Sequence, residues 1–272
     1  MAGSRLAVAR TAKLYVRGAF PRSESGRSYV VTSHDGTFLA NAARASRKDA
    51  RDAVTAARGA FAGWSGATAY NRGQVLYRLA ETMETRTDAL AAASSGRREV
   101  ARAIDRVVWY AGWADKLAQV LGSSNPVAGP YFNFTLPEPT GVVAVIAPEE
   151  PALDGLVSRL VPALVGGNAV VAVASEAHPL AAIELAEAVA TSDVPAGVVN
   201  VLTGLRAELA PVLAGHMDVN AIDVTGADGE RAALEQLAAE NVKRVVRAKE
   251  EQSPWEIASF MELKTVWHPI GR

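Results

Sequence analysis

The hydrophobic pattern in the second half of the chain alternates between two kinds of segment. Residues 141–146, 168–173 and 197–202 are continuous apolar runs, as expected for strands buried on both faces. Amphipathic helical patterns at 153–165, 179–191 and 207–215 separate or follow them. This alternation predicts an α/β fold with a Rossmann-like parallel sheet and flanking helices. Right-handed crossovers would place any ligand at the carboxyl ends of the strands.

The first part of the chain reads differently, as short strands followed by helices. Strands are predicted at 14–16, at 29–31 and from Phe38, with a turn at His34-Asp35-Gly36, which together suggest a β-meander. Ser46 and Asp49 have the spacing of a capping box, so a helix is expected to begin there and to end after Trp64. This part therefore forms an N-terminal β and helical appendage to the sheet.

Two more amphipathic helices are predicted at 71–84 and 99–121, each longer than three turns. Residues 122–130 are rich in turn formers. The partly alternating segment 131–136 that follows is expected to be an edge strand or one arm of a hairpin.

Composition excludes several classes of function. The 272 residues are 49% hydrophobic and 21% charged with a net charge of -1, which offers no electrostatic footprint for nucleic acid or an acidic membrane. The absence of cysteine excludes disulfides and cysteine metal sites, and it favours the cytoplasm. The four histidines lie far apart in sequence, so no metal site is expected.

Many ordered motifs resemble those of the aldehyde dehydrogenase family, in register from residue 14 to residue 254. No single motif would identify the family, but together they cover most of the chain. They include Ser25-Gly26, Ala111-Gly112-Trp113, Pro139-Thr140-Gly141, Gly166-Gly167-Asn168, Ser175-Glu176, Pro195-Ala196-Gly197 and Thr225-Gly226.

The resemblance implies a dinucleotide site, for NAD or NADP, in which only some of the expected residues are present. The family's ribose-binding lysine falls on Val173 and its phosphate-contacting serine on Ala227. Because these losses coincide, the site is expected to be vestigial, with weak or absent cofactor binding. The positions that still match are Pro148, Ser175, Glu176, Gly204, Thr225 and Gly226.

The family's catalytic positions are also changed. Its nucleophile is a cysteine, which this chain lacks, and its oxyanion-binding asparagine falls on Glu150. A carboxylate cannot donate a hydrogen bond to a developing oxyanion and would repel it. The general-base glutamate falls on Ala248. The resemblance therefore implies that no catalytic site is intact.

The resemblance also divides the chain. Residues 1–13 are expected to be flexible, 14–136 to hold the N-terminal strands, helices and an oligomerisation hairpin, and 137–254 to form the degenerate dinucleotide-binding-like domain. Residues 255–272 resemble the family's C-terminal oligomerisation strand, reached without the intervening catalytic domain. Contact with a partner subunit would use Glu262, Leu263, Val266 and Trp267. The alternative is that this tail folds back on its own sheet.

Three functions are compatible with this sequence. The first is a pseudoenzyme, a non-catalytic homologue that assembles with an active full-length aldehyde dehydrogenase or with itself. The second is an enzyme of altered chemistry that uses Glu149 and Glu150 as paired carboxylates, although the simpler expectation is that these residues cap a helix beginning at Pro151. The third is an NAD(P)-binding sensor that uses Glu176, Thr225 and Gly226.

Overall fold

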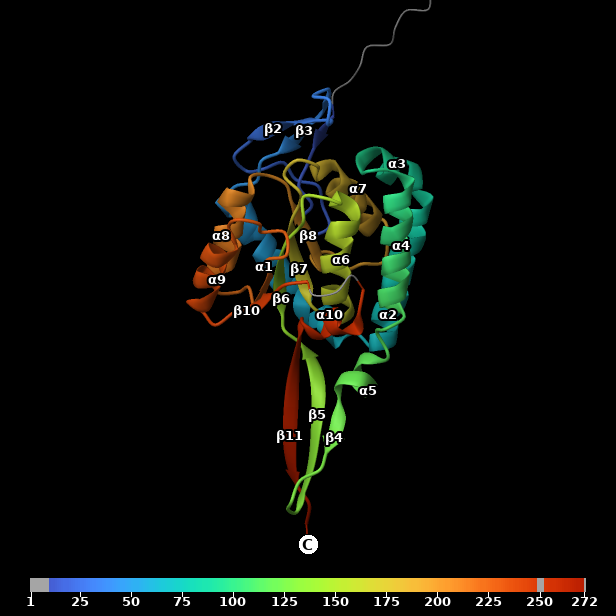
Figure 1. Ribbon diagram of the computed structural model, residues 1–272, viewed down its shortest axis with the longest axis vertical. Helices are drawn as coiled ribbons and strands as arrows, with labels where there is room; N and C mark the ends of the chain where they lie inside the picture. The colour runs from blue at the N-terminus through green and yellow to red at the C-terminus, as the bar shows by residue number, and fades with distance from the viewer. Residues whose placement is uncertain (1–9, 249–251, 272) are drawn as a thin grey trace, which may run out of the picture.

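The computed structural model describes residues 10–248 and 252–271. Its centre is a parallel five-stranded sheet in the order β10-β9-β6-β7-β8 (Figure 1). The strands are β6 (Val142–Ile146), β7 (Ala169–Val173), β8 (Val199–Leu202), β9 (Ala221–Asp223) and β10 (Arg244–Val246). The predicted α/β fold is confirmed, because β6, β7 and β8 coincide with the three apolar runs and pair in parallel.

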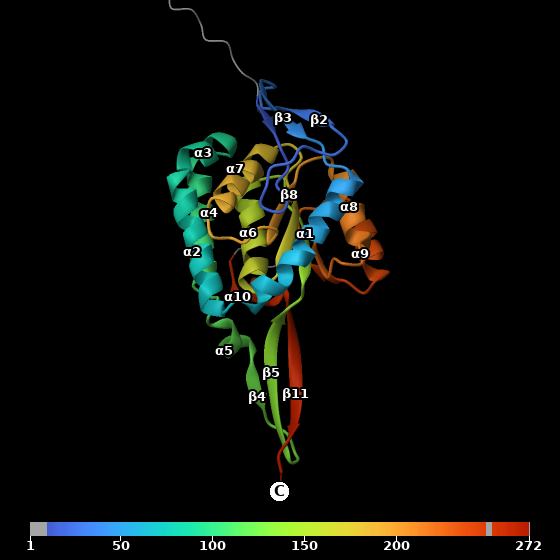
Figure 2. The ribbon, with the colours of Figure 1, turned by 180° about the vertical axis from the view of Figure 1, so that it is seen from behind.

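Helices cover both faces of this sheet (Figures 1 and 2). One face packs against α1 (Arg47–Gly66) and α8 (Arg206–Gly215), with α9 (Arg231–Ala239) beside α8. The other face packs against α6 (Ala152–Val165) and α7 (Pro179–Ala190), behind which lie α2 (Ala69–Thr85) and α4 (Arg97–Ala111). Alternate residues of β6 enter two separate hydrophobic cores, which is why the whole strand is apolar.

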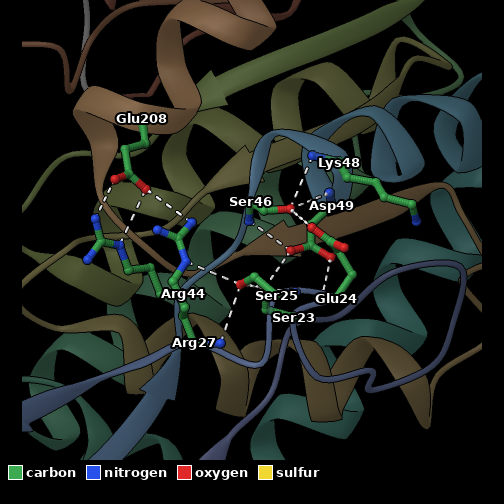
Figure 3. Close-up of polar contacts among 9 residues, drawn as sticks. All are labelled: Ser23, Glu24, Ser25, Arg27, Arg44, Ser46, Lys48, Asp49 and Glu208. Carbon is green, nitrogen blue, oxygen red and sulfur yellow. Dashed lines mark hydrogen bonds and ion pairs between the residues drawn. The ribbon is translucent and has the colours of Figure 1, made fainter.

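The predicted capping box forms the N-terminus of α1, and its aspartate also hydrogen-bonds to residues 23 and 24 of the preceding segment (Figure 3). Ser46 Oγ accepts hydrogen bonds from the N–H groups of Lys48 and Asp49, while the Asp49 carboxylate accepts from Ser46 N. The same carboxylate accepts from Ser23 Oγ at 2.7 Å and from Glu24 N at 3.1 Å. One buried aspartate therefore satisfies both the helix terminus and the start of the turn from Ser23 to Gly26.

The N-terminal strands form a small sheet in the order β1-β3-β2, which differs in part from the predicted meander. β2 (Ser28–Thr32) and β3 (Phe38–Ala43) pair as a hairpin around the expected turn, but β1 (Thr11–Ala12) pairs with β3 in parallel. The strand expected at 14–16 is wrong, since Tyr15 and Val16 form only isolated bridges. The flexible segment expected to reach residue 13 is wrong for 10–13, where Ala12 is buried; residues 1–9 lie outside the described residues.

The helix predicted at 99–121 is two helices. α4 ends at Ala111 and α5 (Leu117–Leu121) follows after a turn. The break comes at Gly112, whose low helix propensity outweighs the apolar periodicity that continues beyond it. A short helix, α3 (Thr87–Ala93), was not predicted because it carries only one buried side chain, Leu90.

A three-stranded antiparallel arm projects from the body (Figures 1 and 2). Its order is β11-β5-β4, where β4 is Ser123–Asn125, β5 is Tyr131–Pro139 and β11 is Met261–Pro269. Segment 131–136 thus belongs to the central strand, so the edge-strand alternative is wrong. The hairpin alternative is confirmed, because β4 and β5 pair antiparallel on either side of residues 126–130. β11 pairs with β5 of its own chain from Met261↔Pro139 to Pro269↔Tyr131, so the tail does fold back on its own sheet.

The base of the arm is attached to the body by a buried arginine. Arg159 of α6 donates from Nε to Asp223 at 2.6 Å and from Nη1 to Glu256 at 2.5 Å. Glu256 lies in α10 (Pro254–Ala258), the short helix that leads into β11. All three side chains are at most 2% exposed, so this link between sheet and tail is shielded from water.

Candidate functional site

The sheet has a topological switch point beside β6. The chain leaves β6 for β7 on one side and later places β9 on its other side. In open α/β sheets, ligands bind in the crevice between the loops at such a point, outside the carboxyl ends of the strands. The retained positions of the sequence analysis gather here, in the loops that follow four strands: Pro148 after β6, Ser175 and Glu176 after β7, Gly204 after β8, and Thr225 and Gly226 after β9.

Arg206, the first residue of α8, crosses this crevice. Its guanidinium donates from Nη1 to Gly226 O at 2.6 Å and from Nη2 to Ala147 O at 2.8 Å. Nη2 also pairs with the Glu149 carboxylate. The side chain is only 13% exposed. Arg206 therefore joins the loops after β6 and β9 at the place where an open crevice would separate them.

The Glu149 carboxylate fills a second part of the crevice. It accepts hydrogen bonds from Ser175 Oγ at 2.7 Å and from the backbone N–H groups of Glu176 and Ala177, both at 3.2 Å. Consecutive N–H groups of this kind form an anion site. Burial acts to raise the pKa of Glu149, but these donors and the Arg206 charge together hold that pKa below its ordinary value. Glu149 is therefore an ionised acceptor that occupies an anion site of its own chain.

Glu176 and Gly204 help to place Arg206 at the start of α8. Glu176 Oε2 accepts the backbone N–H of Arg206 at 2.9 Å, which fixes the start of α8. Gly204 has a φ of +142°, a conformation that side chains rarely adopt, and a Cβ there would lie 3.0 Å from Ala45 N. Both residues position Arg206.

Thr225 and Gly226 bring the loop after β9 against the loop after β6. A Cβ added to Gly226 would lie 2.2 Å from Ala147 O, so only glycine allows this approach. Gly226 N donates to Ile146 O at 3.1 Å, and Thr225 Oγ1 accepts from Ala248 N at 2.8 Å. The two loops are therefore in direct contact beneath the Arg206 guanidinium.

Glu150 and Ala248, the two degenerate catalytic positions, are brought to one cavity. This cavity of about 610 Å³ is also lined by Pro148, Arg102 and Asp154. Glu150 is exposed, and its carboxylate contacts His178 Nε2 at 3.0 Å. Glu150 and Glu149 therefore have different partners, and no hydrogen bond joins their carboxylates within the described part of the chain.

The expected helix-capping role of Glu149 and Glu150 is wrong. Helix α6 begins after Pro151 without a side-chain cap from its own segment. Instead Glu99, a buried residue of α4, accepts from Leu153 N at 2.7 Å and from Asp154 N at 3.0 Å. The helix terminus was already occupied by a distant carboxylate, which sequence spacing could not reveal.

The residue that the sequence analysis missed is Arg206. A cation at a helix N-terminus is unfavourable beside the helix dipole, so an arginine there signals a carboxylate partner nearby. In residues 10–248 and 252–271, no three side chains of the metal-binding types form a group that could hold an ion. No helix within these ranges is both long and apolar enough to span a membrane.

Comparison with known proteins agrees with this fold. The model of the aldehyde dehydrogenase family matches residues 20–268. An aldehyde dehydrogenase of Davidiella tassiana is 31% identical over 253 residues, covering 89% of this chain and 50% of that protein. The cytosolic 10-formyltetrahydrofolate dehydrogenase of Xenopus tropicalis is 33% identical over 251 residues, covering 86% of this chain and 28% of that protein.

Solved structures give the same result. HpcC from Thermus thermophilus superposes with a TM-score of 0.83 at 31% identity, covering 88% of this chain and 48% of that one. PnpE from Pseudomonas sp. WBC-3 superposes with a TM-score of 0.80 at 33% identity, covering 87% and 50%. The chain spans about half the length of the Davidiella aldehyde dehydrogenase. By sequence and by structure, this chain belongs to the aldehyde dehydrogenase family.

Proposed function

We propose that this protein is a non-catalytic member of its family that acts as a structural or regulatory subunit. It would assemble through its arm with an active aldehyde dehydrogenase or with itself. The observation that carries this proposal is the crevice at the switch point, which the chain's own Arg206 and Glu149 occupy.

The occupied crevice argues against cofactor binding. A dinucleotide pyrophosphate needs free donors, and here the N–H groups of Glu176 and Ala177 already donate to Glu149. The exposed Glu150 carboxylate adds a further negative charge at the carboxyl end of β6. The described residues therefore do not suit NAD or NADP.

The same residues argue against aldehyde oxidation. No cysteine is available as a nucleophile, and Glu150 cannot stabilise an oxyanion. Paired-carboxylate chemistry is not favoured either, because Glu149 is held ionised by Ser175 and Arg206 and cannot serve as a proton donor near neutral pH.

The arm supplies the surface for assembly. On one of its faces Leu263 is 57% and Trp267 59% exposed, and on the other Phe132 is 48% and Leu136 46% exposed. The outer edge of β11 pairs with no other strand in the described ranges. Apolar side chains on both faces and an unpaired edge are features that a soluble protein covers with a partner.

Two measurements test the proposal. Light scattering after size-exclusion chromatography should show a self-assembly, or a stable complex when the protein is co-expressed with a cysteine-containing full-length relative from the same genome. Trp267→Asp should abolish either assembly, whereas Lys264→Ser, a polar change on the same strand, should not. A wild-type protein that stays monomeric and forms no complex would refute the assembly role. Robust NAD reduction with simple aldehydes by the purified protein would refute the non-catalytic role.

A further inference from the structure

A cleft separates the N-terminal sheet from the carboxyl ends of β6 and β7. It consists of two adjoining cavities of about 640 Å³ and 590 Å³. Both are lined by β2 and the turn that follows it, and both reach His178 at the start of α7. Four residues line the two cavities in common: Val31, Ser33, His34 and His178. Volumes of this size are typical of small-molecule sites.

One part of the cleft is apolar. Its wall combines side chains from five different elements, and Leu39 is 49% exposed. The apolar residues that line it are Val31, Leu39, Ala92, Ala93, Ala152 and Leu180. This wall can hold the hydrocarbon part of a ligand.

Two carboxylates near His178 lack a lysine or arginine partner among the described residues. Glu150 lines the larger cavity and contacts only His178, while Glu176 lines the smaller one and accepts only the backbone N–H of Arg206. The cations nearby are already paired: Arg102 with Asp154, Arg206 with Glu149, and Arg44 with Glu208. The Glu176 charge also acts on Arg44, but the two form no salt bridge.

The other carboxylate in the larger cavity is already satisfied. Glu99 accepts from Ser95 N and Ser95 Oγ as well as from the start of α6. The charge available to a ligand is therefore negative, and it is located on Glu150 and Glu176.

Tyr29 lines the smaller cavity. Its hydroxyl is buried beside the Gly204 backbone. Burial, and then the nearby Glu176 charge, raise the pKa of Tyr29, so it remains a neutral phenol. As a neutral phenol it adds no charge to the cleft, so the carboxylates set the charge of this region.

We propose that this cleft binds a small amine with an apolar body. The ammonium group would lie between Glu150 and Glu176, and the body would lie along the wall formed by Leu39, Ala93 and Leu180. A cation is favoured because the two free charges are carboxylates, and an apolar body because the rest of the larger cavity offers few free polar groups. This site adjoins the Arg206 crevice and shares Glu176 with it, and none of its lining residues belongs to the arm.

Isothermal titration calorimetry with hexylammonium and hexanoate tests the charge preference, because these probes share one body and carry opposite charges. Hexylammonium should bind at least about tenfold more tightly than hexanoate. Glu150→Gln and Glu176→Gln should each weaken hexylammonium binding by about fivefold. Glu240→Gln, at an exposed carboxylate on the far end of α9, should leave binding unchanged.

Filling the apolar wall tests the second half of the proposal. Ala93→Phe should remove binding of hexylammonium while circular dichroism shows the fold intact, and Ala233→Phe on exposed α9 should not affect it. Equal binding of the two probes, undiminished binding by the Glu150→Gln, Glu176→Gln double variant, or no binding of hexylammonium up to about 10 mM would overturn the proposal.

Discussion

Substitution of Arg206 by alanine should cost this protein a measurable part of its folding stability. The change removes two hydrogen bonds from a guanidinium to the buried carbonyl groups of Gly226 and Ala147, and it leaves Glu149 without its cation. Hydrogen bonds that involve a charged group each contribute about 1.5 kcal/mol or more. The ion pair adds less, because Glu149 is 40% exposed and partly screened by solvent. We expect a total loss of about 3 kcal/mol.

Urea denaturation followed by circular dichroism at pH 7 measures this loss. Arg206→Lys should retain the charge but lose the planar guanidinium, whose N–H groups reach three acceptors. Its free energy of unfolding should therefore fall by about half as much as that of Arg206→Ala. Arg97→Ala is the matched control, since Arg97 pairs with Asp88 at an exposed surface and its removal should have little effect. A loss for Arg206→Ala no larger than for Arg97→Ala would refute a structural role for the crevice residues.

Acid titration gives an independent check on Glu149. Its pKa is lower in the folded protein than its ordinary value of 4.5, so its stabilising contribution is present above that value and is lost as the pH falls below it. The difference in unfolding free energy between the wild type and Glu149→Gln should therefore be largest near neutral pH and shrink in acid. A difference that does not change between pH 7 and acid would show that the donors around Glu149 do not favour its charged form.

Three further predictions concern other parts of the fold. Burial lowers the pKa of Lys243 from 10.5 to about 8, so the unfolded chain holds the Lys243 proton more tightly than the folded protein does. The free energy of unfolding should therefore rise by up to about 3 kcal/mol as the pH increases from about 8 to about 10.5. Urea titrations should show this rise for the wild type and a flatter dependence on pH for Lys243→Met. Ser46→Ala removes the cap of α1 and should cost about 1 kcal/mol by thermal denaturation, whereas Ser65→Ala near the exposed end of that helix should cost much less. Arg159→Met leaves the buried Asp223 and Glu256 without their shared cation and should cost about 3 to 5 kcal/mol, which calorimetric unfolding would detect; a loss below about 1 kcal/mol would contradict the account of the arm's base.

The parallel sheet could be predicted from the sequence because its signals are local. The run at 141–146 is apolar throughout since alternate side chains of β6 enter two cores, and Ser46 and Asp49 form their capping box within one turn. The break after Ala111 was missed because Gly112 lies inside an apolar pattern that continues on both sides. Local propensity and periodicity conflict there, and only the packed structure decides between them.

The site was harder to predict because its contacts join distant segments. Ser175 and Gly204 follow the apolar runs at 168–173 and 197–202, so their place beyond the ends of β7 and β8 could be read from the sequence. Gly226 follows the three-residue strand β9, for which no apolar run was identified. Arg206 reaches Ala147, 59 residues away, and Glu99 caps a helix that begins more than 50 residues later. Neither side chain has a sequence neighbour that indicates its partner, so the occupation of the crevice emerged only from the structure.

Arg206 and Glu149 would hold the loops at the switch point together in the absence of any ligand. A protein that binds a cofactor is stabilised by it, and its loops at the crevice are held partly by the bound molecule. Here the loops after β6, β7, β8 and β9 are held together by hydrogen bonds of the protein's own Arg206 and Glu149. Their partners are Ala147, Ser175, Glu176 and Gly226. Their stabilising effect does not depend on any ligand concentration. The melting temperature of this protein should therefore be the same with and without millimolar NAD, whereas a crevice that binds the dinucleotide would show a rise.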